Sequence, residues 1–273
     1  MAGQTLAGRR IAITGGARGI GLATARELIA RGASVAIGDV DVESAKQAAN
    51  GVGAVAFGLD VSDAESFATF LSEAKDALGG LDVLINNAGI MPIGPLLEMA
   101  PATYQRAVDI NVAGPLHGTR LALPDLVAQG SGHIVNVAST AGKTAVPGGV
   151  AYCATKAAIV SLTEGARLEF AGTGVHFTCV MPAFTNTELI AGTQGVRFIK
   201  NVEPEDVATA IADAIEKPRM DVYVPSMIAP ILKTQPLLGR RLRDFLNRRL
   251  GAYDTFLKID HTKRDAYDDR IKG

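Results

Sequence analysis

The fold of this chain follows from residues 11–21, which read Ile11-Ala12-Ile13-Thr14-Gly15-Gly16-Ala17-Arg18-Gly19-Ile20-Gly21. A short apolar run, typical of a buried strand, leads directly into a glycine-rich turn. After the turn, apolar residues recur at the spacing of one helical face. A strand, a glycine turn and a helix in this order form a cradle for dinucleotide phosphates, because the glycines permit close approach and the helix N-terminus offers free N–H groups. We therefore expect a dinucleotide-binding unit here.

Asp39 indicates which dinucleotide is bound. It ends the next apolar run, about 20 residues beyond the glycines, where a carboxylate can accept hydrogen bonds from the ribose hydroxyls. Such a carboxylate repels a 2′-phosphate, so NAD is favoured over NADP. Two alternatives are that Asp39 only caps a turn with Asp41, and that Arg18 binds the 2′-phosphate of NADP. We expect Asp39 to prevail, which leaves NADP as the runner-up.

Strand and helix patterns alternate along residues 1–224. Apolar runs predict strands near residues 9–14, 34–39, 54–58, 81–86, 132–138, 174–181 and 221–224, and helical spacing predicts helices near 19–31, 42–50, 63–78, 103–129, 151–171 and 205–217. This alternation is typical of a parallel sheet that is covered on both faces. We expect an α/β fold with a single Rossmann-type doubly wound sheet of about seven strands.

Tyr152 and Lys156 form a second signal, four residues apart in a predicted helix. Positions i and i+4 share a helical face, so the phenol and the ammonium would point at one spot. A nearby cation favours the phenolate and lowers the pKa of a tyrosine from its ordinary value near ~10. A tyrosine tuned in this way can exchange a proton with an alcohol oxygen. The pair alone is a weak signal, because many helices carry one by chance.

Several polar or turn-forming residues follow directly after predicted strands. Ligands of doubly wound sheets bind beyond the carboxyl ends of the strands, so one crevice can collect all of these residues. They are Asp39, Asp60, Asn87, Ser139 and Pro182.

Together these motifs resemble the short-chain dehydrogenase/reductase family. Residues 14–21 resemble its T-G-x-x-x-G-x-G turn, residues 59–61 its adenine-pocket motif, residues 86–89 its N-N-A-G segment and residues 182–187 its P-G-x-x-x-T segment. Asn111, Ser139, Tyr152 and Lys156 match the catalytic tetrad of the family. The resemblance covers roughly residues 8–224, with Ala183 in place of the usual glycine and Thr185 in place of an apolar β-branched residue.

The resemblance implies hydride transfer between an alcohol or ketone and a nicotinamide cofactor. Ser139 would bind the substrate oxygen, Tyr152 would exchange its proton, and Lys156 would lower the pKa of Tyr152 and hold the nicotinamide ribose. Asn111 would support a water chain to solvent. The cofactor contacts that the motifs and the resemblance predict are Gly15, Arg18, Gly19, Ile20, Gly21, Asp39, Asp60, Val61, Asn87, Ala88, Gly89, Tyr152, Lys156, Pro182, Thr185 and Thr187.

Pro115 lies inside the helix predicted at residues 103–129 and has no N–H to donate. The carbonyl of Asn111, four residues earlier, would lose its helical partner and could hold a water against Lys156. A plain kink that shapes packing is the alternative.

The composition is that of a globular enzyme. The chain has 273 residues, is 48% apolar and carries a formal net charge of −1, which gives no indication of nucleic-acid binding. The four His residues are scattered and show no metal-binding spacing, so we expect no metal site.

No stretch approaches the ~20 apolar residues that span a bilayer, and no signal region is evident. With two cysteines, Cys153 and Cys179, we expect a cytoplasmic protein with reduced thiols.

The expected substrate pocket is apolar, without an Arg or Lys to bind a carboxylate. This favours a hydrophobic secondary alcohol or ketone, such as a steroid, a retinoid or another lipid-like molecule. Residues 187–201 are expected to form a mobile lid, because they contain two glycines. The expected walls, some of which could instead belong to the core, are Ile90, Met91, Ile93, Val146, Pro147, Phe184, Leu189 and Ile190.

Residues 225–273 are predicted to form a helical, basic, amphipathic extension of the catalytic domain at residues 1–224. The extension holds eleven Lys and Arg against six Asp. Such an extension most often packs on its own domain or on a sister subunit, whereas contact with an anionic membrane is less favoured. It resembles the extensions of retinol- and hydroxysteroid-dehydrogenase-like members. Its apolar stripe consists of Leu238, Leu242, Phe245, Leu246 and Leu250.

Two other functions stay open. One is an NADP-dependent carbonyl reductase, and the other is a non-catalytic nucleotide-sensing protein on the same fold, because a fold does not fix function. The intact set of Ser139, Tyr152 and Lys156 argues against a sensor. By family analogy we expect a homodimer or homotetramer that assembles through the helices at residues 103–129 and 151–171.

Overall fold

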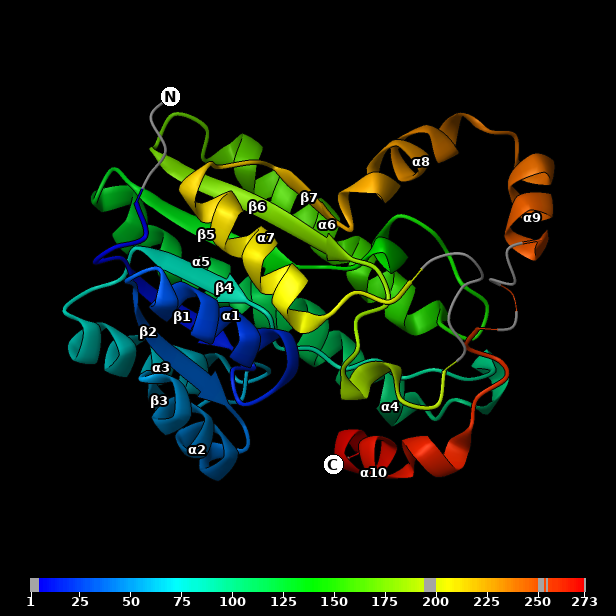
Figure 1. Cartoon of the computed structure of the whole chain (residues 1–273), viewed down its shortest axis with the longest axis horizontal. Helices are drawn as coiled ribbons and strands as arrows, with labels where there is room; N and C mark the ends of the chain where they lie inside the picture. The colour runs from blue at the N-terminus through cyan, green and yellow to red at the C-terminus, as the bar shows by residue number, and fades with distance from the viewer. Residues whose placement is uncertain (1–4, 194–199, 250–252, 254, 273) are drawn as a thin grey trace.

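The structure is a computed structural model that describes residues 5–193, 200–249, 253 and 255–272 (Figure 1). Part of the expected lid, residues 194–199, lies outside the described residues, as does Leu250 of the expected stripe.

One parallel sheet runs through the middle of the molecule (Figure 1). Its strands are β1 (Arg10–Thr14), β2 (Ser34–Asp39), β3 (Val55–Gly58), β4 (Val83–Asn86), β5 (Gly132–Val137), β6 (Val175–Pro182) and β7 (Asp221–Val224). They lie in the order β3-β2-β1-β4-β5-β6-β7, and every neighbouring pair is parallel. The expected doubly wound sheet of seven strands is therefore confirmed.

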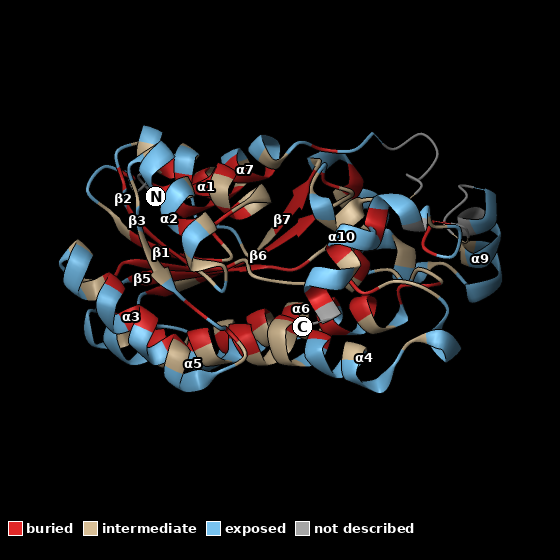
Figure 2. Cartoon of the chain, turned by 90° about the horizontal axis from the view of Figure 1, so that it is seen from below, coloured by how far each residue is buried: buried red, intermediate tan, exposed pale blue. Residues whose placement is uncertain are grey.

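Helices cover both faces of this sheet (Figure 2). The first seven are α1 (Gly19–Ala30), α2 (Val42–Val52), α3 (Ala64–Leu78), α4 (Pro101–Val108), α5 (Gly114–Ala128), α6 (Val150–Glu169) and α7 (Pro204–Glu216). Helices α1, α2 and α7 lie on one face, and α3, α5 and α6 lie on the other. Short 3-10 turns occur at Leu96–Glu98, Thr140–Gly142, Glu188–Ile190, Ser226–Ile228 and Gln235–Leu237.

Each face of the sheet has its own apolar core. Ile11, Ile13 and Ile37 point to the face of α1 and α7, where they pack with Leu28 and Ile211. The alternate strand residues Ala12, Ala36 and Leu84 point to the opposite face and pack with residues of α3 and α5. Successive side chains of a strand alternate between faces, so a fully buried strand is apolar throughout. This explains why the strands appear in the sequence as unbroken apolar runs.

Local capping fixes where the helices of the dinucleotide-binding half begin and end. Asp41 accepts a hydrogen bond from the Ser44 N–H at the start of α2, and Asp63 does the same for α3. Gly53 and Gly79 end these two helices in the left-handed conformation, at φ values of 84° and 76°. These caps keep the connections short and hold each strand end near its neighbours.

The helix expected at residues 103–129 is present from Pro101 to Ala128, but it is not regular. The segment is divided into α4, a π-helical turn at Asp109–Ala113 and α5, and the Gly114 N–H donates to the Asp109 carbonyl. Pro115 lies at the start of α5 and cannot donate a hydrogen bond to the Asn111 carbonyl, so a regular α-helical ladder cannot pass this point. The widened turn contains Asn111.

The C-terminal residues form α8 (Ala229–Thr234), α9 (Arg240–Arg249) and α10 (His261–Lys272). Helices α8 and α9 project from the sheet, whereas α10 lies beside the body of the molecule near α4 (Figures 1 and 2). Two residues of the expected apolar stripe, Leu242 and Phe245, are exposed on α9. Among the described residues, no helix is both long and apolar enough to cross a bilayer. The division at residues 224 and 225 stays a prediction.

Candidate active site

A cavity of about 1350 Å³ opens at the carboxyl ends of the strands. It gathers residues that lie directly beyond six different strands, as expected for a doubly wound sheet. The residues predicted from sequence that line it are Gly15, Arg18, Gly19, Ile20, Asp39, Asp60, Val61, Asn87, Ala88, Gly89, Ser139, Tyr152, Lys156, Pro182, Thr185 and Thr187. Gly21 and Asn111 do not line the cavity. They contact residues that do, Gly15 and Ile90 respectively.

The glycine-rich turn forms one end of the cavity. Gly15 and Gly19 have φ values of 66° and 53°, a conformation that other residues rarely adopt. Gly21 packs so closely that a Cβ atom there would lie 2.1 Å from the carbonyl oxygen of Gly15. Helix α1 begins at Gly19, and within the described chain no side chain caps it. Its first N–H groups and its positive dipole end therefore face the cavity, as an anion-binding cradle requires.

Asn87 and Thr14 connect this turn to β4. The Thr14 hydroxyl accepts hydrogen bonds from the backbone N–H groups of Asn87 and Ala88, both at 3.0 Å. The Asn87 amide in turn donates to the carbonyl oxygens of Thr14 and Gly15, at 3.0 Å each. The two strand ends that flank the centre of the cavity are thereby held together.

Asp39 and Arg18 lie at the same end. The Asp39 carboxylate accepts hydrogen bonds from the N–H groups of Ala17 and Asp41, both at 3.1 Å, so it is fixed beside the glycine turn. The Arg18 guanidinium pairs with Asp41 at 2.6 Å and lies 4.0 Å from Glu188. Asp39 therefore contributes to the turn around Asp41 and also lines the cavity, where its remaining lone pairs can accept hydrogen bonds.

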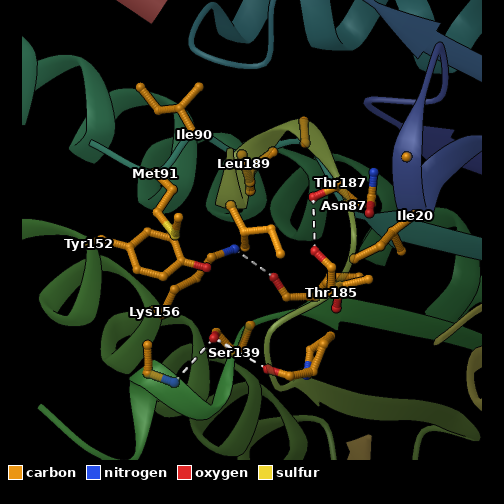
Figure 3. A pocket seen from close by; sticks show the side chains of 18 of the residues that line it. Ile20, Asn87, Ile90, Met91, Ser139, Tyr152, Lys156, Thr185, Thr187 and Leu189 are labelled. Atoms are coloured by element: carbon orange, nitrogen blue, oxygen red, sulfur yellow. Dashed lines mark hydrogen bonds between the residues drawn. The ribbon is translucent and has the colours of Figure 1, made fainter. Parts of the chain in front are cut away.

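Tyr152 and Lys156 project from successive turns of α6, as their spacing predicts. Both are buried, and together with Ser139 they point toward one space (Figure 3). The Lys156 ammonium donates to the Val137 carbonyl at 2.9 Å and lies 5.9 Å from the centre of the Tyr152 ring. The phenol and the ammonium thus lie near each other beside the carboxyl end of β5.

The pKa values of this pair differ from the expectation. Burial raises the pKa of Tyr152 well above its ordinary value, and the nearby Ser139 hydroxyl opposes this only partly. Burial lowers the pKa of Lys156 to about 8. The prediction that Lys156 lowers the pKa of Tyr152 is therefore wrong for this structure, because loss of hydration dominates and the ammonium is bonded to Val137.

Ser139 stands at the end of β5 and caps the 3-10 turn that follows it. Its Oγ accepts from the Ala141 N–H at 3.1 Å and donates to the Pro182 carbonyl at 3.4 Å. The hydroxyl thus joins the ends of β5 and β6 at the cavity wall.

Asn111 is buried within the π-helical turn, and its side chain holds the backbone of Ile90. Its Oδ1 accepts from the Ile90 N–H and its Nδ2 donates to the Ile90 carbonyl, both at 2.8 Å. A Cβ atom on Gly89 would lie 3.2 Å from Asn111 Oδ1 and 3.4 Å from Lys156 Nζ. Asn111 therefore shapes the loop after β4 beside Lys156.

This geometry combines a glycine-rich turn before an uncapped helix start, the Asp39 carboxylate, and a tyrosine and a lysine from one helix in a single cavity. Residues 9–195 match the family model described as short chain dehydrogenase. The chain belongs to the short-chain dehydrogenase family.

Curated members of this family are similar over most of the chain. A cis-4-hydroxycyclohexanecarboxylate dehydrogenase of Sinomonas cyclohexanicum is 39% identical, over 77% of this chain and 90% of its own length. The 2,5-dichloro-2,5-cyclohexadiene-1,4-diol dehydrogenase LinX of Sphingobium indicum is 38% identical, over 68% of this chain and 76% of its own.

Solved structures of the family share the fold. A short-chain dehydrogenase/reductase of Burkholderia phymatum in complex with NAD has a TM-score of 0.77 and 27% identity, covering 86% of this chain and 95% of its own. A 3-ketoacyl-(acyl-carrier-protein) reductase of Brucella melitensis complexed with NADH has a TM-score of 0.74 and 28% identity, covering 80% and 97%.

The substrate end of this family member contains residues that the sequence did not indicate. Six of the expected walls line the cavity, whereas Ile93 and Pro147 do not. Contrary to expectation, basic side chains also line it, at Arg106, Arg243 and Arg270. The other unexpected wall residues come from the C-terminal region and include Phe256, Tyr267 and Ile271. The only signal for them was the spacing of Tyr267 and Ile271 on one helical face.

Proposed function

We propose that this family member is an NAD-dependent oxidoreductase that transfers hydride between a hydrophobic secondary alcohol or ketone and nicotinamide, with Tyr152 as the acid and base. The observation that carries the proposal is the joint lining of one cavity by the glycine cradle, Asp39, Ser139, Tyr152 and Lys156. A non-catalytic nucleotide sensor would not need the last three side chains.

The residues present fit a dinucleotide. The uncapped start of α1 suits the pyrophosphate, Asp39 suits the ribose hydroxyls, and Gly15 and Gly19 leave room for close approach. When bound, the nicotinamide accepts or supplies the hydride. Arg18 is already paired with Asp41, which supports NAD over NADP, because this guanidinium would have to leave a carboxylate to bind a 2′-phosphate. Further contacts are proposed for Asp60, Val61, Asn87, Pro182, Thr185 and Thr187.

In this proposal the Tyr152 hydroxyl exchanges a proton with the substrate oxygen, which Ser139 holds by a hydrogen bond. Lys156 carries its charge at neutral pH, because its pKa of about 8 is still above 7. In the proposal its ammonium binds the nicotinamide ribose. Asn111 fixes the loop after β4 at Ile90, beside the ammonium.

The substrate class follows from the apolar end of the cavity. Met91, Tyr152 and Phe256 form one buried cluster, with Phe184 and Leu189 packed against it. Two similar dehydrogenases are named for alicyclic alcohols, which supports a ring-bearing, hydrophobic secondary alcohol. The basic residue Arg106 extends the proposal to substrates that also carry a carboxylate. Resemblance to retinol- and hydroxysteroid-dehydrogenase-like members remains part of this proposal.

A screen of alicyclic, steroid and retinoid alcohols and ketones with NAD(H) and NADP(H) tests the function. We expect turnover of at least one ring-bearing secondary alcohol with NAD. Absence of turnover with every pair, together with absence of NADH binding, would overturn the proposal. NADH binding without any turnover would favour the sensor.

The reductive direction has its own support. Because burial raises the pKa of Tyr152, the residue stays a neutral phenol at physiological pH, so the proton that a carbonyl oxygen would take is already in place. Carbonyl reduction is therefore the second candidate function.

Asp39→Asn tests the choice of cofactor. The amide keeps the size of the side chain but removes the charge that repels a 2′-phosphate. We expect the ratio of NADPH to NADH dissociation constants to fall about 100-fold, which corresponds to ~3 kcal/mol. Dinucleotide fluorescence measures both constants without a substrate. Asp60→Asn, which removes a charge elsewhere in the cavity, should leave the ratio within about twofold; an equal change in both variants would contradict the assignment.

The pH dependence of carbonyl reduction follows from Lys156. Its pKa of about 8 means that its charge is present below pH 8 and is lost above it, while Tyr152 stays protonated. We expect kcat/KM to be level below pH 8 and to fall about tenfold for each pH unit above it. The profile should be recorded with a fixed, subsaturating ketone. A level profile from pH 7 to pH 10 would refute the need for this charge.

Two remaining parts of the proposal concern the cellular compartment and the oligomeric state of the enzyme. Both cysteines are free thiols and buried, which supports a reducing compartment such as the cytoplasm. Assembly as a homodimer or homotetramer is proposed through the helical face that contains α4, α5 and α6.

A further inference from the structure

The loop after β4 is bonded on two sides by distant elements. Ile90 has both of its backbone groups bonded to the Asn111 side chain. Met91, the next residue, has both of its backbone groups bonded to α10: its N–H donates to the Tyr267 hydroxyl at 2.8 Å, and its carbonyl accepts from Arg264 Nη2. Side chains of α10 therefore satisfy the backbone hydrogen-bonding groups of Met91, as a neighbouring strand would.

Arg264 is the largest fully buried side chain in the described part of the molecule, at 0% exposure. Its Nη1 donates to the carbonyl oxygens of Leu189 at 2.7 Å and Ala191 at 3.2 Å. Its Nε lies 2.9 Å from the carboxylate of Asp268, one turn along the same helix. A buried guanidinium is tolerated only when its charge and donors are paired, and here the partners lie in two separate loops.

Further contacts join α10 to the loop that contains Leu189. The Asp260 N–H donates to the Gly192 carbonyl at 2.9 Å, just before α10 begins. A Cβ atom on Gly192 would lie 2.3 Å from the Asp260 carbonyl oxygen, so the approach depends on glycine. Arg270 forms an ion pair with Glu188. The start and the end of α10 are therefore both bonded to this loop.

We propose that Arg264 is a positioning residue for the substrate side of the cavity. Its hydrogen bonds join the loop of Met91 to the loop of Leu189. The same bonds fix the position of α10, whose residues Tyr267 and Ile271 line the cavity. The bonds of Arg264 and Tyr267 that hold these loops end on Met91, Leu189 and Ala191, and not on the glycine cradle. We call Arg264 with its bonds to Met91, Leu189 and Ala191 the Arg264 clamp. Substrate binding depends on this clamp more strongly than dinucleotide binding does, because the clamp does not bond to the glycine-rich turn at residues 15–21. The proposal rests on the function proposed above.

Arg264→Met is the direct test. Methionine keeps the apolar stem but leaves three carbonyls and Asp268 without their partner. We expect amide exchange of a peptide spanning residues 88–93 to become about 100-fold faster, and kcat/KM for the best alcohol of the screen to fall about 100-fold, mainly through KM. Because Ala88 and Gly89 are proposed cofactor contacts in the same loop, the NADH dissociation constant should rise too, but by less than about tenfold and therefore far less than KM.

Lys263→Met is the matched control, because it removes the same charge from the adjacent, exposed position of the same helix. All three readouts should stay at wild-type values. Arg264→Lys, which keeps the charge but not the fork of donors, should give intermediate exchange and KM values.

Tyr267→Phe is a milder variant in case Arg264→Met fails to fold. It removes only the oxygen that accepts from the Met91 N–H, so we expect about tenfold faster exchange at residues 88–93. Unchanged exchange and KM in both variants would overturn the proposal. An equal loss of NADH binding would also overturn it, because Arg264 would then support the whole fold. Amide exchange needs no substrate, so altered exchange in a protein without turnover would refute the proposed activity but not the clamp.

Discussion

Tyr152→Phe is expected to lower kcat about 10³-fold or more in either direction while the NADH dissociation constant stays almost unchanged. The substitution removes one oxygen from a buried ring and leaves the cluster of Met91 and Phe256 in place. Without that oxygen the proposed acid and base is lost, and the nearby Lys156 ammonium is already bonded to Val137. Steady-state kinetics and dinucleotide fluorescence measure the two effects.

Tyr223→Phe is the matched control. Tyr223 is also buried, its pKa is also raised by burial, to about 12, and Lys233 lies 5.7 Å from the centre of its ring, yet it does not line the cavity. Its removal should change kcat less than about twofold. Substantial turnover by Tyr152→Phe, or an equal loss in the control, would show that the proton is transferred by another group.

Gly21→Ala is expected to weaken NADH binding at least about 100-fold. The added Cβ would lie 2.1 Å from the Gly15 carbonyl oxygen and 2.7 Å from the Asn87 amide, so the turn and the bond between them must move. The same clash should lower the free energy of unfolding by about 2 kcal/mol. Urea unfolding and NADH titration measure the two effects.

Gly51→Ala is the control for that substitution. Gly51 lies in α2, where a Cβ would meet nothing within 4 Å, so alanine should raise the free energy of unfolding by about 0.5–1 kcal/mol through its better helix propensity. Wild-type NADH affinity in Gly21→Ala would contradict the close packing of the cradle.

The sheet and the dinucleotide end of the cavity could be predicted from the sequence because their signals are local. An apolar run, a glycine turn and a helix follow one another within residues 10–30, and the ends of parallel strands meet at one edge. Strand bounds accordingly differ from those expected by only one or two residues. The lining of the cavity by Ser139, Tyr152 and Lys156 follows from the same topology.

The parts that could not be predicted depend on contacts between distant residues. Helix α10 appears in the sequence as a charged surface helix, because its buried face contains Arg264 and no continuous apolar stripe. The carbonyls that make this burial tolerable lie 75 and 173 residues away. The pKa of Tyr152 likewise depends on how deeply the residue is buried and on the direction in which Lys156 points. The i, i+4 spacing predicts neither of these.

The separation of α6 from α10 has an evolutionary consequence. The residues proposed to move the proton come from α6, whereas the residues that support the opposite wall come from a helix about a hundred positions later in the chain. On the proposed function, substitutions in α10 can therefore alter substrate binding while the proton-transferring residues stay unchanged. Descendants of one ancestral enzyme could diversify in this way through substitutions in this one helix.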